Sequence, residues 1–153
     1  MLKISKLTDY ATVIMSYIAK HDSHRQIATE VSQATGIALP TVSKVLKALT
    51  KAHILHSTRG AHGGYQLARP AEQISVATII NALEGPIALT ECSLSTDICE
   101  QNGSCEISGN WEKINRAIQG ALESVSLADM VIPDSTRPFE INIPVDSILS
   151  ARR

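Results

Sequence analysis

The sequence predicts a mainly α-helical protein, a winged helix-turn-helix with a two-stranded wing, followed by a cysteine loop and a long dimerisation helix. Three observations predict this fold class. Apolar residues recur at helical spacing through residues 7–49. Two strand-like segments joined by a glycine-rich connection come directly afterwards. All three cysteines then precede a further amphipathic segment.

Two short helices are expected at the start of the chain. Ser5 or Thr8 can cap the first helix, and Asp9 lies in its first turn. A carboxylate there is stabilised by the positive end of the helix, and from position alone this is the simplest role for Asp9. The second helix follows the polar segment 21–25 and ends at Gly36. The apolar face of the first helix is formed by Leu7, Ala11, Ile14 and Ile18.

A third helix is expected to begin at Pro40, because proline is tolerated in the first turn. One face of this helix is apolar, and the opposite face is cationic and bears small polar residues. Solvation alone would explain the lysines, but their place in the third helix of a helix-turn-helix pattern suggests contact with a polyanion. The apolar face carries Val42, Val45, Leu46 and Leu49, and the outer face carries Thr41, Ser43, Lys44, Lys47 and Lys51.

The predicted wing is a hairpin of two strands, 54–58 and 65–68, joined by the glycine-rich segment 59–64. Arg59 and His62 at its tip could reach phosphates or a minor groove, and Gly63 and Gly64 would let the backbone approach DNA closely. A helix followed by a wing makes nucleic-acid binding the favoured function. No paired nucleophile and base or phosphate-binding glycine loop indicates an enzyme.

The net charge differs between the N-terminal and C-terminal parts of the chain. Residues 1–70 contain nine Lys and Arg against three Asp and Glu, a net of +6, whereas residues 71–153 contain five against twelve, a net of −7. The basic part suits a polyanionic partner. No apolar run approaches the roughly 18 residues of a membrane span, and no signal peptide is apparent, so we expect a cytoplasmic protein that does not bind membranes.

The three cysteines, Cys92, Cys99 and Cys105, are close enough to share one metal centre. Their number is odd, which excludes a closed set of internal disulfides. Thiolates select zinc, copper(I) or iron-sulfur clusters, and the gaps of six and five residues favour a cluster over the close pairs of a zinc knuckle. All five histidines precede the segment, so a carboxylate, a hydroxyl or a second subunit would supply a fourth ligand.

Two further helices flank the cysteines. Ser75 is expected to cap a fourth helix that ends at Gly85–Pro86. After the cysteines, a heptad seam predicts a helix that packs on its own body or on another subunit, although Gly120 interrupts it. A short terminal helix is expected at 126–130. The seam comprises Trp111, Ile114, Ile118, Ala121, Val125 and Ala128.

These elements divide the chain into four parts. We expect a DNA-binding domain in residues 1–85, a cluster-binding loop in residues 86–109, a dimerisation helix with its short terminal helix in residues 110–132, and a flexible tail in residues 133–153.

Taken together, the segment Leu7-Thr-Asp-Tyr10, the Thr41–Lys44 helix, the Arg59–Arg69 hairpin and the three cysteines resemble the Rrf-type regulators, the winged-helix family that contains IscR and NsrR. The segment Leu83–Cys92 is most similar to the subgroup that controls the SUF iron-sulfur assembly system. The resemblance covers residues 1–132.

This resemblance implies a homodimer that binds double-stranded DNA at a two-fold related operator. It also implies a 2Fe-2S or 4Fe-4S cluster held by Cys92, Cys99 and Cys105 near the first helix of the other subunit. IscR-like proteins use a histidine three residues after the last cysteine, and this chain has Ser108 there. NsrR-like proteins use an aspartate at the place of Asp9, which makes Asp9 of the partner subunit the first candidate, with Glu106 and Ser108 behind it.

The implied function is a transcriptional repressor that senses iron-sulfur status and controls iron-sulfur assembly genes. Two alternatives stay open. The Asp9 pattern also suits a nitric-oxide-sensing repressor, and a zinc-stabilised DNA-binding module would need no sensing role.

Overall fold

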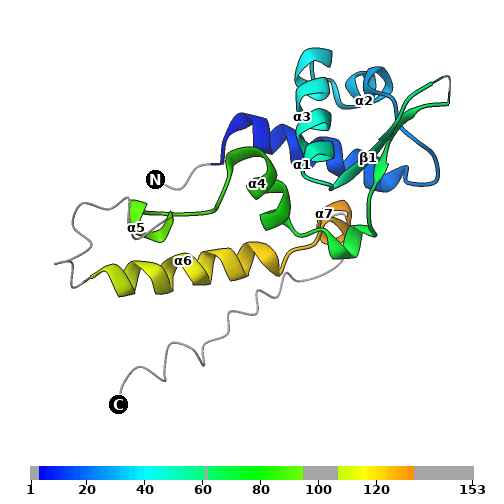
Figure 1. The fold of residues 1–153 in the computed structure, drawn as a ribbon. Helices are drawn as coiled ribbons and strands as arrows, with labels where there is room; N and C mark the ends of the chain where they lie inside the picture. Colours follow the sequence, from blue (N-terminus) through cyan, green and yellow to red (C-terminus); the bar gives the residue numbers. More distant parts are fainter. Residues whose placement is uncertain (1–3, 61, 95–106, 133–153) are drawn as a thin grey trace.

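The computed structural model describes residues 4–60, 62–94 and 107–132 (Figure 1). The described part is mainly helical with one two-stranded antiparallel sheet, as predicted. No helix in these ranges is long and apolar enough to cross a membrane. In chain order the elements are α1 (Lys6–Lys20), α2 (Ala28–Thr35), α3 (Leu39–Lys51), β1 (Leu55–Thr58), β2 (Gly64–Leu67), the 3-10 turn η1 (Ala71–Gln73), α4 (Val76–Glu84), α5 (Glu91–Leu94), α6 (Ser108–Glu123) and α7 (Leu127–Val131).

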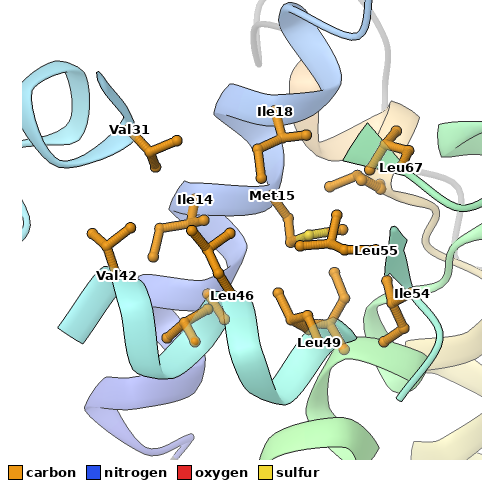
Figure 2. Close-up of a cluster of buried hydrophobic side chains, with 14 of the residues drawn as sticks. Ile14, Met15, Ile18, Val31, Val42, Leu46, Leu49, Ile54, Leu55 and Leu67 are labelled. Carbon is orange, nitrogen blue, oxygen red and sulfur yellow. The ribbon is translucent and has the colours of Figure 1, made fainter. Parts of the chain in front are cut away.

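Helices α1, α2 and α3 pack around one apolar core, as the helical spacing predicts (Figure 2). Ser5 caps α1 by accepting a hydrogen bond from the backbone N–H of Thr8, so the first of the two proposed caps is the one used. Thr8 itself is buried. Pro40 lies in the first turn of α3, and Gly36 ends α2 in the left-handed conformation. The predicted apolar stripe of α3 is fully buried and comprises Val42, Val45, Leu46 and Leu49.

The wing is an antiparallel hairpin in which Thr58 pairs with Gly64 next to the tip and Leu55 pairs with Leu67 at the base. Both strands begin and end within one residue of the predicted bounds. A third segment, which the sequence did not predict, extends the sheet because Gln26 forms an antiparallel bridge to Tyr65.

Helix α7 returns to the N-terminal body (Figure 1). Ser75 bridges to Ser126, and the N–H of Leu127 donates to the carbonyl of Ile74 at 2.7 Å. Leu127 is completely buried in the core that contains Ile14 and Leu49. The short terminal helix therefore packs with the N-terminal body instead of continuing α6.

The heptad pattern overestimated the length of the helix after the cysteines. Helix α6 passes through Gly120 without a break but ends at Glu123. Val125 lies in the connection to α7, where its carbonyl accepts a hydrogen bond from the N–H of Val76 at 2.9 Å. The connection between α6 and α7 is hydrogen-bonded to the segment 74–76, so the helix cannot continue through it. Val125 and Ala128 therefore do not lie on the same helix as Trp111. Neither η1 nor α5 was predicted.

Candidate functional site

The outer face of α3 presents its cations to solvent. The side chains of Lys44, Lys47 and Lys51 are exposed, and those of Thr41 and Ser43 are half-buried beside them. The one ion pair among the described residues joins Arg116 to Glu112 on α6, so no described carboxylate neutralises these lysines. A face of this kind can contact phosphates through its lysines and base edges through its hydroxyl groups.

The wing tip is a tight turn closed by a hydrogen bond from the N–H of Gly63 to the carbonyl of Gly60, at 2.9 Å. A Cβ at Gly63 would lie 2.3 Å from the carbonyl oxygen of Thr58, and Gly64 has φ +150°. The turn itself therefore requires both glycines, whatever the tip contacts. Arg59 and His62 are exposed on either side of the tip.

The proposed cysteine ligands lie mostly outside the described residues. Cys99 and Cys105 fall in the segment 95–106, and only the backbone of Cys92 is described, within α5. Within residues 4–60, 62–94 and 107–132 no group of three His, Cys, Asp or Glu side chains could hold a metal ion. Ser108 begins α6, and its side chain is likewise outside the description, as is all of Glu106.

Asp9 is exposed in the first turn of α1. Its backbone is fixed, because its N–H donates to the carbonyl of Ser5 and its carbonyl accepts from the hydroxyl of Thr12 at 2.7 Å. No described group donates a hydrogen bond to its carboxylate. Three soft thiolates in the sequence suit an iron-sulfur cluster. The carboxylate of Asp9 is a hard oxygen donor on a fixed backbone.

A neighbouring carboxylate that the sequence did not indicate, Glu84, connects α4 to the start of α1. Its Oε1 accepts a hydrogen bond from the N–H of Ser5 at 3.0 Å. Hydrogen bonds from the side chains of Thr8 and Ser5 hold the pKa of the Glu84 carboxyl below its ordinary value, against a smaller opposing effect of burial. Glu84 thus assists the cap of the helix that carries Asp9.

Asn115 is a second residue that the sequence analysis missed. It is 7% exposed on α6, and its side chain bonds to the backbone at two points. Its Oδ1 accepts from the N–H of Leu89, and its Nδ2 donates to the carbonyl of Ile87, both at 3.1 Å. Asn115 therefore anchors the segment that leads to Cys92. The sequence contains one indication of this role. Helical spacing places the polar amide of Asn115 among Trp111, Ile118 and Leu122 on the apolar face of α6.

An apolar groove of about 690 Å³ lies between α6, the end of α4 and the segment 85–89. Trp111 and Ile114 remain 38% and 45% exposed along it, and Ile4 is 46% exposed. Three predicted seam residues, Trp111, Ile114 and Ile118, line this groove, whereas Ala121 is half-buried nearby on α6. The groove leaves an apolar strip accessible to another chain.

Comparison with known proteins identifies similar chains over most of this length. A family model described as "Rrf2: Iron-dependent Transcriptional regulator" matches residues 4–133. Protein rrf2 of Nitratidesulfovibrio vulgaris is 33% identical over 138 residues, which cover 90% of this chain and 92% of that protein.

Two solved structures support the same relationship. CymR (YrzC), the global cysteine regulator of B. subtilis, aligns with a TM-score of 0.70 and 29% identity over 86% of this chain and 97% of its own. IscR of T. potens aligns with a TM-score of 0.66 and 27% identity over 91% of this chain and 94% of its own.

Proposed function

Because this chain belongs to the Rrf2 family of winged-helix transcriptional regulators, we propose that it represses iron-sulfur assembly (SUF) genes in response to iron-sulfur cluster status. The regulator class, as opposed to an enzyme, follows from the family. The observation that carries the specific role is a trio of cysteines in a chain whose α1 presents an uncommitted carboxylate at Asp9.

The DNA interface comprises the outer face of α3 and the wing tip. Lys44, Lys47 and Lys51 contact phosphates, whereas Thr41, Ser43 and Arg59 reach base edges or the groove. At His62, Gly63 and Gly64 the wing tip approaches the sugar-phosphate backbone of the DNA. Support comes from the exposure of the three lysines and of Arg59, none of which is paired with a described carboxylate.

A homodimer is the assembly that best accounts for the groove along α6. Trp111, Ile114 and Ile118 form an apolar strip that a monomer would leave in water. Covering this strip with the equivalent helix of a second copy would bury it symmetrically and present two recognition helices to a two-fold related operator. Ala121 lies at the edge of the same interface.

The cluster ligands in this proposal are Cys92, Cys99, Cys105 and the partner subunit's Asp9. When bound, the cluster supplies a labile link between subunits. Asp9 contributes a hard oxygen ligand among soft thiolates, and its backbone is held by Ser5 and Thr12. Asn115, on α6, binds the backbone of the segment that precedes Cys92. The ligand segment is therefore attached to the helix that we place in the dimer interface.

The test is selection of genomic DNA by the full-length protein under anaerobic conditions. Purified wild-type protein and a variant with all three cysteines changed to serine are each incubated with fragments of the source genome, and the bound fragments are sequenced. The proposal expects enrichment of iron-sulfur assembly promoters by one redox or cluster state of the wild type, and no such state dependence in the variant. Equal enrichment by both proteins would refute cluster-dependent control.

Nitric oxide is the second candidate signal, favoured by the availability of the Asp9 carboxylate. A reporter placed behind the selected promoter separates the two signals. Derepression by iron starvation supports the assembly role, whereas derepression by nitric oxide alone supports the alternative.

A further inference from the structure

The polar connection between α1 and α2 is part of the wing sheet. The N–H of Gln26 donates to the carbonyl of Tyr65 at 2.9 Å, and the N–H of Tyr65 donates back to Gln26 at 2.8 Å. The side chain of Gln26 is 3% exposed, and its Nε2 donates to the carbonyls of His21 and His24. This connection is therefore held in a fixed position beside the start of β2.

Arg25 occupies the exposed position next to this anchor. Its Nη1 donates to the carbonyl of His62 at 3.5 Å, which places the guanidinium against the wing tip. Gly64 permits this approach, because a Cβ there would lie 3.0 Å from the Cβ of Arg25. The contact to His62 is long, and it occupies one of the five N–H donors of a guanidinium.

The charge of Arg25 is also unneutralised. Among the described residues, no carboxylate lies within ion-pair distance of its guanidinium. Arg59 and His62 are exposed on the same tip, so the guanidinium of Arg25 adds to the positive charge that Arg59 presents to solvent there. A planar guanidinium with free donors is well suited to bind a phosphate through two hydrogen bonds.

We propose that Arg25 is a further DNA-binding residue, which binds a backbone phosphate beside the wing tip. The inference rests on the proposed DNA-binding function and extends the interface to the connection between α1 and α2, which joins the wing sheet through Gln26. Sequence patterns did not reveal it, because the Gln26–Tyr65 bridge that brings Arg25 to the tip joins residues distant in the chain.

Salt dependence distinguishes a phosphate contact from a merely structural role in the wing. Binding of the full-length protein to a labelled, mixed-sequence DNA duplex of about 30 base pairs is followed by fluorescence anisotropy across a range of salt concentrations. We expect Arg25→Ala to weaken binding and to reduce the slope of log K against log salt by about one unit. Arg25→Lys keeps the charge and should retain most of the slope.

Arg69→Ala is the matched control, since Arg69 is an exposed arginine beyond the opposite end of β2. It should retain the wild-type slope. A wild-type slope in Arg25→Ala, with either unchanged or weaker binding, would overturn the phosphate contact while leaving the proposed function intact. Wild-type protein that shows no salt-dependent DNA binding would instead refute the proposed function, and this inference with it.

Discussion

The carboxylate of Glu84 accepts a hydrogen bond from the backbone N–H of Ser5, with 3.0 Å between oxygen and nitrogen. Ser5 caps the start of α1, and Glu84 is the last residue of α4, so the bond joins two helix ends through residues that are 79 positions apart in sequence. Gly85 and Pro86 follow at once and lead to the segment that Asn115 anchors. The start of α1 and the lead-in to Cys92 are thereby fixed to one body.

The Glu84 contact predicts a dependence of stability on pH. Because hydrogen bonds to Thr8 and Ser5 lower the pKa of Glu84 in the folded protein, the contribution is present above the unfolded glutamate pKa of about 4.3 and is lost as the pH falls through the lower folded value. The side chain is exposed, so we expect less than about 1 kcal/mol. In the Glu84→Gln variant, the free energy of unfolding measured in urea should vary less with pH over this acidic range. A pH profile identical to that of the wild type would contradict the prediction.

Asn115→Ala should destabilise the protein by about 1–3 kcal/mol, because the N–H of Leu89 and the carbonyl of Ile87 would lose their partner in a largely buried place. Asn81→Ala is the control, since Asn81 is exposed on α4 and its loss should change stability by no more than about 0.5 kcal/mol. Denaturant unfolding measures both. Equal effects of the two substitutions would show that Asn115 is not an anchor.

Gly63→Ala should reduce DNA affinity by about tenfold or more, since its Cβ would lie 2.3 Å from the Thr58 carbonyl oxygen and the wing backbone must shift. Gly120→Ala provides the comparison. Nothing lies within 4 Å of a Cβ there, so helix propensity should raise stability by about 0.5–1 kcal/mol without affecting DNA binding. Anisotropy titrations would rule out a steric role for Gly63 if the two variants bound equally.

Lys47→Ala should weaken binding to all DNA sequences alike and reduce the salt slope by about one unit, as expected for a phosphate contact. Lys113→Ala, an exposed lysine on α6, should leave the slope unchanged. Loss of discrimination between sequences in Lys47→Ala, with an unaltered slope, would instead assign Lys47 to base recognition.

Local patterns predicted the helices and strands of the N-terminal body well. The stripe from Val42 to Leu49, the Ser75 cap and the wing were read from spacing and turn residues, because each depends on neighbours in the chain. Long-range hydrogen bonds were not predictable in this way. The end of α6 at Glu123 depends on the pairing of segment 74–76 with 125–127, and the roles of Glu84 and Asn115 depend on backbone groups far away in sequence.

The same distinction applies to the candidate site. The exposure of the α3 lysines follows from helical periodicity, whereas the assignment of Asp9 as a ligand rests on a family resemblance and stays a prediction. The position of Arg25 at the wing tip required knowledge of the Gln26–Tyr65 bridge.

An anaerobic native mass spectrum of freshly purified full-length protein is the decisive test of cluster binding, because it reports subunit number and bound mass together. We expect a dimer that carries one two-iron or four-iron cluster per subunit. The Asp9→Ala variant should lose the cluster more readily, while the Glu30→Ala variant, at another exposed carboxylate, should not. A spectrum with only zinc, or with no metal after strictly anaerobic handling, would contradict this expectation.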